Sequence, residues 1–148
     1  MDFGTLVHKI LEIATLDVGS ISKGEMKQMF ELVPDDFEMA WEASLRIINA
    51  PPMKRFFDSL EYLKAQNEVA YVNRSGDMRR IDRLVEFDEE IWIVDYKISL
   101  DHHSKPSSEM RRQYKSQLVQ YRDDLVNIGV GKPIRIGVVL SGGELIEL

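Results

Sequence analysis

Asp95 and Lys97 are the residues of this sequence whose types and spacing point most directly to chemistry. They end the run Ile91–Lys97, whose β-branched and aromatic residues are typical of a β-strand. Because side chains alternate along a strand, Asp95 and Lys97 point to the same side. Another acid, Asp82, lies thirteen residues before Asp95 in a second strand-like run. Metal-dependent phosphodiester hydrolysis requires such a set, in which two carboxylates hold a divalent cation and a lysine lies near the attacking water.

Each of these residues also has a simpler interpretation. Asp95 and Lys97 are equally consistent with an ordinary surface ion pair at the end of a strand. Strict alternation places Asp82 on one strand face with Leu84 and Glu86, so a buried Asp82 carboxylate needs a partner. A salt bridge to an arginine would supply one, and a metal shared with Asp95 would supply another. Hard oxygen ligands of this kind favour Mg²⁺ or Mn²⁺.

Composition limits the class of protein. The 148 residues, with 44% hydrophobic and 30% charged, predict a single globular domain over residues 1–148, with a possible helical insertion at residues 16–60. The chain has no cysteine, which excludes disulfides, zinc–thiolate sites and iron–sulfur clusters and fits a cytoplasmic location. No apolar run approaches the roughly 20 residues of a membrane span, and the N-terminus lacks the pattern of a signal peptide. We therefore expect no membrane partner.

The net charge of −6 is unfavourable for binding nucleic acid by bulk electrostatics. Basic residues nevertheless gather in two places. Arg79 and Arg80 lie in the second strand-like run, and Arg111, Arg112 and Lys115 lie in a predicted helix. These five are candidate contacts to DNA phosphates, although a solvated helix face is the simplest interpretation of the second group.

The spacing of apolar residues predicts the elements that position these groups. It first follows the helical period and predicts helices over residues 3–15, 23–32, 36–48 and 53–60. It then changes to a strand pattern and predicts three neighbouring antiparallel strands, over residues 68–72, 78–87 and 91–98. A helix over residues 109–127 and strands over residues 134–140 and 144–148 complete the order. His102 and His103 fall in a predicted loop, where adjacent histidines seldom form a rigid site.

Five short motifs follow one another along the chain. They are Gly4-Thr5-Leu6-Val7-His8, Asn67-Glu68-Val69, Arg80-Ile81-Asp82-Arg83, Val94-Asp95-Tyr96-Lys97 and Gln117-Leu118-Val119-Gln120-Tyr121. In residue types, order and predicted elements they resemble the RecB-type nuclease domain of the PD-(D/E)xK superfamily, which RecB and AddA helicase–nucleases contain. The resemblance implies an α/β fold with a restriction-endonuclease-like core. In that fold a mixed central sheet of about five strands is flanked by helices and preceded by a helical N-terminal segment.

The resemblance also implies a metal site. Carried over residue by residue, it assigns His8, Asp82 and Asp95 as ligands of Mg²⁺ or Mn²⁺, with the backbone carbonyl of Tyr96 as a further ligand. Asp82 and Asp95 are then catalytic as well. From the residues alone, His8 would be a half-exposed surface histidine at the edge of the apolar stripe of its helix.

The remaining implied roles concern catalysis. Lys97 is the catalytic lysine, Glu68 is a supporting acid, and Gln117 and Tyr121 line the site from their helix. Gln117 and Tyr121 are four residues apart and therefore share one helix face. Plain core packing is the alternative interpretation of Tyr121.

Two features depart from the family pattern. The proline of the superfamily's name is absent, since Ile81 precedes Asp82. A bulky cation, Arg79 or Arg80, stands where relatives often have a small residue, and there it would contact DNA or narrow the cleft.

The motifs together predict a Mg²⁺- or Mn²⁺-dependent deoxyribonuclease. The resemblance implies the exonuclease module of a helicase–nuclease that acts in DNA recombination and repair. Its expected partners are DNA, single-stranded or at ends, and a helicase domain or subunit, and the start of the first motif at Gly4 suggests a module of a larger polypeptide or complex. The alternative is a catalytically inactive nuclease-fold domain that serves such a complex as a DNA-binding or scaffold part.

Overall fold

The fold was analysed in a computed structural model that describes residues 2–15, 21–30, 34–98, 108–127 and 131–148. Its helical elements are α1 (Phe3–Ala14), α2 (Lys23–Met29), α3 (Pro34–Asn49), the 3₁₀ turn η1 (Pro51–Met53), α4 (Lys54–Phe57) and α5 (Ser108–Asn127). Its strands are β1 (Lys64–Val72), β2 (Met78–Glu86), β3 (Ile91–Lys97), β4 (Ile134–Leu140) and β5 (Leu145–Glu147).

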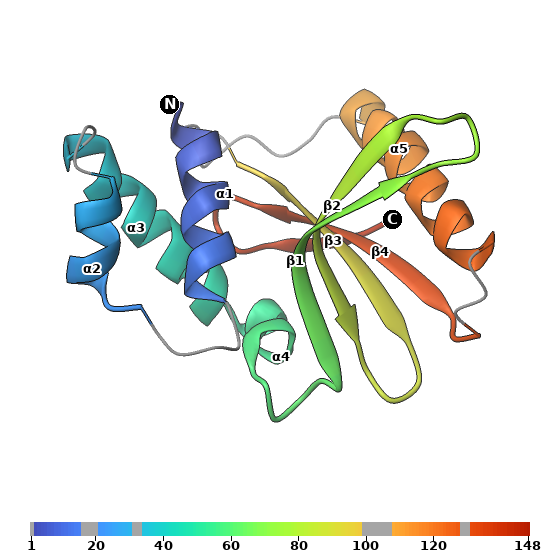
Figure 1. The fold of residues 1–148 in the computed structure, drawn as a ribbon, viewed down its shortest axis with the longest axis horizontal. Coiled ribbons are helices and arrows are strands. Elements are labelled where there is room, and N and C mark those ends of the chain that lie inside the picture. The colour runs from blue at the N-terminus through green and yellow to red at the C-terminus, as the bar shows by residue number, and fades with distance from the viewer. Residues whose placement is uncertain (1, 16–20, 31–33, 99–107, 128–130) are drawn as a thin grey trace.

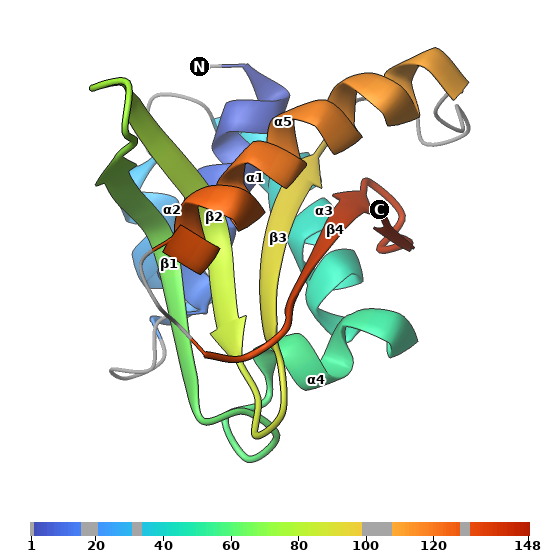
Figure 2. The same ribbon diagram turned by 90° about the vertical axis from the view of Figure 1, so that its right-hand side faces the viewer.

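The five strands form one mixed sheet in the order β1-β2-β3-β4-β5. β1, β2 and β3 are an antiparallel meander, as predicted, and β4 lies parallel to β3 because α5 carries the chain back across the sheet. β5 pairs antiparallel with β4 at the edge. Figures 1 and 2 show α1 to α4 on one side of the sheet and α5 on the other. The predicted mixed sheet flanked by helices is therefore confirmed.

Side-chain alternation in the central strands builds a core on each face of the sheet. Val94 and Tyr96 face the helices α1 to α4, and Ile93 faces α5 together with Ile136 of β4. The first core also includes Phe37 and other residues of the helices between α1 and β1. None of the described helices combines the length and apolar character that a membrane span requires.

Several element boundaries differ from the sequence predictions, and the helix predicted over residues 23–32 ends at Met29. β1 begins at Lys64 and not at residue 68, because its polar first residues pair with β2, with Lys64 opposite Glu86. Cross-strand pairing thus overrides their weak β-propensity. The helix predicted over residues 53–60 ends at Phe57, and the helix predicted from residue 36 begins at Pro34. The predicted loop histidines, His102 and His103, lie outside the described residues.

Candidate active site

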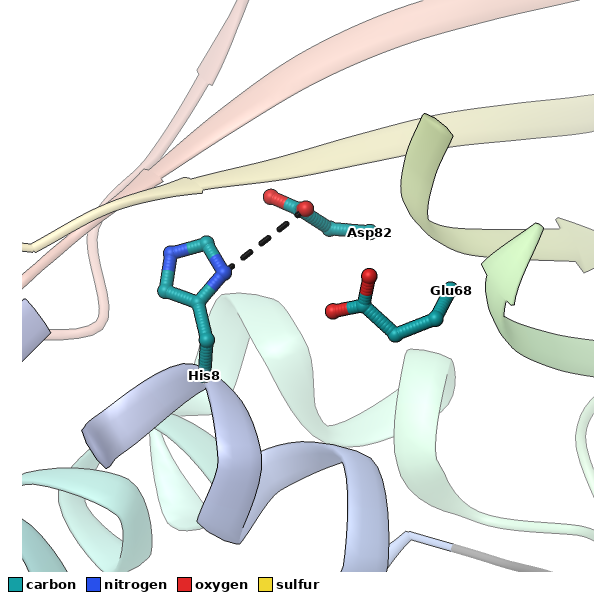
Figure 3. A group of neighbouring side chains, drawn as sticks. All are labelled: His8, Glu68 and Asp82. Atoms are coloured by element: carbon teal, nitrogen blue, oxygen red, sulfur yellow. Dashed lines mark ion pairs between the residues drawn. The ribbon is translucent and has the colours of Figure 1, made fainter. Parts of the chain in front are cut away.

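Three side chains of the types that bind metals converge at the point where β2 separates from β3. His8 comes from α1, Glu68 from β1 and Asp82 from β2 (Figure 3). One nitrogen or oxygen atom of each lies within 4.8 Å of those of the other two. His8 Nδ1 lies 3.7 Å from Asp82 Oδ1. We call this group the His8–Glu68–Asp82 cluster.

Asp82 is held at the end of a hydrogen-bond ladder. The main chain of β2 pairs with β3 only from Arg83 onward, where Arg83 lies opposite Val94. Beyond that pair, the Asp82 carboxylate accepts a hydrogen bond of 2.9 Å from the backbone N–H of Tyr96. The carboxylate thereby replaces a main-chain acceptor and stays tied to β3 although the two backbones diverge.

The strands do not alternate strictly at this point, which differs from the sequence prediction. Ile81 packs in the core beneath α5, whereas Val85 packs in the core beneath α1 to α4. Strict alternation would place these two residues, four positions apart, on the same face, but they face opposite sides of the sheet. Asp82 lies at this change of face and is turned toward α1.

The partner strand is distorted at the matching position. Glu68 lies between the ladder pairs Asn67–Arg83 and Val69–Ile81, and its φ of 50° is in the left-handed region. A residue with a side chain reaches this region at a cost of roughly 1–2 kcal/mol. The distortion is local, and it places the Glu68 carboxylate beside Asp82.

A buried polar network beside Glu68 holds this geometry. Arg83 is only 1% exposed. Its guanidinium donates to the carbonyl of Phe56 and, at 2.7 Å, to Asn67 Oδ1. The amide of Asn67 in turn donates to the Glu12 carbonyl and to Thr15 Oγ1 at the end of α1. The sequence analysis assigned no role to Asn67. The available signal for Arg83 was a basic residue whose neighbours two positions away on the strand, Ile81 and Val85, are apolar.

His8 reaches the cluster because α1 lies close to the end of β3. Asp2 caps the helix by accepting a 2.8 Å hydrogen bond from the N–H of Thr5. A Cβ at Gly4 would lie 3.3 Å from the carbonyl oxygen of Ile98, a tight contact that glycine avoids. One turn later, His8 Nε2 lies 2.9 Å from the carbonyl oxygen of Tyr96, and the two rings pack edge to face. This approach explains the Gly-x-x-x-His spacing.

Asp95 and Lys97 extend the site along β3. Lys97 Nζ lies 3.0 Å from Asp95 Oδ2, and Asp95 is 7% exposed. Although the charges are in contact, no donor among the described residues is aligned for a hydrogen bond to that buried oxygen. Asp95 Oδ2 therefore keeps acceptor capacity for a cation. The Lys97 ammonium also lies 5.1 Å from the ring centre of Tyr114 on α5.

The electrostatics of the two aspartates favour cation binding. Burial, the nearby charge of Asp95 and a hydrogen bond between the two carboxyls together raise the pKa of Asp82 from 3.8 to about 8, against the opposing N–H of Tyr96. Burial alone would lower the pKa of Lys97, but the negative charge of Asp95 in contact with it outweighs burial and raises it. Lys97 therefore holds its proton, whereas Asp82 is ionised at neutral pH only if positive charge arrives.

The donor set fits a divalent cation. Carboxylate oxygens with one imidazole suit Mg²⁺ and, better, Mn²⁺. Of the three side chains predicted as ligands, the structure brings His8 and Asp82 together and places Asp95 beside Asp82 but outside the three-residue group. Glu68, predicted as a supporting acid, has a carboxylate oxygen within 4.8 Å of the donor atoms of His8 and Asp82.

The contacts described for the two predicted helix residues, Gln117 and Tyr121, lie within α5 and with β1. Gln117 is exposed, and its amide is 3.5 Å from the Tyr121 hydroxyl. Tyr121 is buried in the core beneath α5, where its ring packs edge to face on Tyr71. Tyr114, one turn before Gln117 on α5, contacts Lys97.

A pocket of about 280 Å³ opens beside the cluster. Its lining residues are Gly4, Thr5, His8, Lys9, Glu68, Arg80 and Asp82. Of the predicted DNA contacts, Arg80 thus borders the pocket, and Arg79 lies 3.9 Å from Asp77. Arg111, Arg112 and Lys115 are exposed on α5.

Comparisons with known proteins agree with this geometry. A crystal structure of a protein from Eubacterium rectale, described as a candidate exonuclease, matches with a TM-score of 0.59 at 15% sequence identity. The match covers 100% of this chain and 59% of that protein, and at this identity it supports the fold alone. No curated protein sequence matches. The family model of the PD-(D/E)XK nuclease superfamily matches residues 1–139, and the chain therefore belongs to that superfamily.

Proposed function

We propose that this chain hydrolyses phosphodiester bonds of DNA at the His8–Glu68–Asp82 cluster with the help of Mg²⁺ or Mn²⁺. Membership of a nuclease superfamily supports the reaction class. The observation that carries the proposal is the buried Asp82 carboxyl, whose pKa is raised by burial and by Asp95. Two ionised carboxylates held so close repel each other and destabilise the fold, unless a cation or a shared proton neutralises part of their charge.

His8, Glu68, Asp82 and Asp95 would hold the cation, with the Tyr96 carbonyl as a further ligand. The 2.9 Å between His8 Nε2 and the Tyr96 oxygen suits a hydrogen bond. The same closeness would let the imidazole and the carbonyl oxygen contact one cation. When bound, the ion would lower the pKa of a coordinated water and neutralise charge on the phosphate.

The chain's own residues would then orient the attacking water and neutralise charge on the phosphate. Asp82 gives up its proton when positive charge enters the cluster. Lys97, which keeps its proton, places a fixed ammonium where it can orient the attacking water or stabilise charge on the phosphate. Asp95 and the Tyr114 ring restrict that ammonium to one position. No covalent intermediate with the protein is required.

We further propose that the chain is the exonuclease module of a helicase–nuclease in DNA recombination and repair. The motif resemblance supports this role, and so does a structural neighbour that is described as a candidate exonuclease and is longer than this chain. The net charge of −6 favours a partner that supplies a positive path for the strand. The cytoplasmic location stays a prediction.

Labelled linear and circular DNA, incubated with Mn²⁺ or with a chelator, tests the proposed activity. We expect cleavage of linear single-stranded DNA with Mn²⁺ and none with the chelator. Intact circular DNA would support the exonuclease mode, and nicked or linearised circles would contradict it. If metal binds but neither substrate is cut, the chain is a nuclease-fold scaffold.

Metal binding should stabilise the fold. Because the ion binds the folded cluster and not the unfolded chain, Mn²⁺ at about 100 times its Kd should raise the free energy of unfolding by about 2.7 kcal/mol. The raised pKa of Asp82 further predicts that binding at pH 7 releases a proton. Calorimetric titration in two buffers with different ionisation enthalpies measures both the affinity and the proton. Absence of any heat and of any shift in Tm at millimolar Mn²⁺ would contradict the metal site.

The isolated chain should bind DNA weakly. At about 150 mM salt, we expect a Kd for short single-stranded DNA no tighter than the micromolar range of non-specific contacts, and a steep loss of affinity with added salt. Fluorescence anisotropy at several salt concentrations measures this. A nanomolar, salt-resistant complex would show that no partner is needed to deliver the strand.

A further inference from the structure

Arg80 and the metal site make competing demands on Glu68. Arg80 Nη1 lies 3.4 Å from Glu68 Oε2, and the two side chains are 61% and 17% exposed. The same Glu68 carboxylate belongs to the cluster with His8 and Asp82. Arg80 also borders the pocket beside the cluster. A guanidinium therefore occupies one side of a carboxylate that the proposed cation would use.

We propose that Arg80 couples DNA binding to metal binding: it competes with the divalent cation for Glu68 in the DNA-free protein and turns to a DNA phosphate when substrate enters. This proposal rests on the proposed function, because it requires the cation at the His8–Glu68–Asp82 cluster and DNA in the adjacent pocket.

The charges and exposure support the exchange. A guanidinium and a divalent cation repel each other, so a metal bound through Glu68 weakens the pair with Arg80. The Arg80 side chain is largely in solvent, so it can leave Glu68 with little loss of packing. A planar guanidinium binds phosphate oxygens through two parallel hydrogen bonds, which gives the released side chain a strong new partner.

The consequence is a reciprocal coupling. If DNA removes Arg80 from Glu68, DNA tightens metal binding, and the metal must tighten DNA binding by the same factor. The factor is set by the strength of an exposed or half-exposed ion pair. Such pairs contribute enough to change an affinity about two- to fivefold.

Two neighbouring cations provide matched controls. Lys9 borders the same pocket, but its ammonium pairs with Glu12 at 3.2 Å. Arg79 is adjacent in sequence and lies 3.9 Å from Asp77. Replacing Lys9 by alanine removes one positive charge beside the pocket, and replacing Arg79 removes one from the residue next to Arg80 on β2. Neither replacement frees Glu68.

The DNA-free arm measures Mn²⁺ affinity by calorimetry for wild type, Arg80→Ala, Lys9→Ala and Arg79→Ala. We expect Arg80→Ala alone to bind Mn²⁺ about two- to fivefold more tightly than wild type. An unchanged or weaker affinity would overturn the proposal, and so would an equal gain in all three variants, which would show a general charge effect.

The DNA arm repeats the titration with a short oligothymidylate, in a Lys97→Ala background that keeps the strand intact. The oligonucleotide should tighten Mn²⁺ binding about two- to fivefold more when Arg80 is present than in Arg80→Ala, where only the direct attraction between phosphate and ion remains. Coupling of equal size with and without Arg80 would overturn the proposal. Absence of Mn²⁺ binding in every protein, wild type included, would overturn the metal site itself and the competition with it.

Discussion

The Lys97→Ala variant is expected to lose DNA cleavage by about 10²- to 10³-fold while it keeps its fold and its Mn²⁺ binding. The wild-type ammonium is fixed by Asp95 at 3.0 Å and by the Tyr114 ring, and it keeps its proton because the charge of Asp95 raises its pKa. Such a preorganised charge acts on the phosphate or water in the transition state and adds little to the binding of the ion. Single-turnover cleavage rates and Mn²⁺ titration measure the two effects separately.

The variant also leaves Asp95 without its cationic partner. A buried polar group left without its partner costs on the order of 1–3 kcal/mol, and a charged one costs more, so the metal-free variant should melt at a lower temperature than wild type. Bound Mn²⁺ should recover most of that loss, since the ion supplies positive charge beside Asp95. Cleavage is therefore compared at saturating Mn²⁺, where both proteins are folded.

Lys132→Ala is the matched control for this variant. Lys132 is 28% exposed, close to the 29% of Lys97, and it also forms an ion pair with an acid, Glu86 at 3.1 Å. It lies at the opposite end of the central strands. The control should lose less stability, because its partner Glu86 is 36% exposed, and it should lose no cleavage. Wild-type cleavage by Lys97→Ala would remove Lys97 from the chemistry, and equal loss in both variants would reduce its role to stability.

The sequence was sufficient for the elements and for most of the cluster because those rest on local rules. The period of apolar residues predicted the order of helices and strands, and strand alternation placed Asp95 and Lys97 on one side. The motif order then connected His8 on a helix with Asp82 on a distant strand. Each of these inferences needs only residue type and spacing.

What the sequence did not show depends on distortions that tertiary contacts impose. Alternation predicted that Asp82 shares a face with Leu84, but β2 changes face at Asp82 because it leaves β3 there. The left-handed backbone of Glu68 is similarly invisible, because no glycine or asparagine marks the position. The network that holds it, Arg83 with Asn67, joins residues whose contacts only the fold creates.

The position of helix α5 along the sheet is a second feature that the sequence did not show. The i, i+4 spacing correctly placed Gln117 and Tyr121 on one face, but it could not fix which turn of that face meets β3. The structure places Tyr114 against Lys97 and buries Tyr121 against Tyr71. Helix position along the sheet is set by core packing beneath it, which a helical period alone does not encode.

The Asp82→Asn variant should lose DNA cleavage and Mn²⁺ stabilisation and yet be more stable than wild type in the absence of metal at weakly alkaline pH. The Asp82 carboxyl titrates at about 8 in the folded protein, against an ordinary value of 3.8. An acid whose pKa is raised by folding contributes full stability below the unfolded pKa and loses it as pH rises through the folded pKa. Asparagine has the shape of the protonated acid and can still accept from the Tyr96 N–H.

Thermal or denaturant unfolding in a chelator, from about pH 5 to about pH 8.5, measures this difference. The advantage of the variant should be smallest at the low end and should grow by on the order of a few kcal/mol toward the high end, because over this range the folded wild type holds a proton on Asp82 that the unfolded chain has lost. Glu86→Gln, on the same strand but paired with Lys132, is the control and should show neither the metal effect nor this pH dependence.

With Mn²⁺ the order of stability of the two proteins should reverse, because only wild type gains from the ion. A stability difference that does not change with pH would show that Asp82 is ionised without metal, and cleavage by the variant would show that another acid holds the ion. The reversal of stability on adding metal is the signature expected of a carboxyl that is costly to bury alone and is kept for the cation.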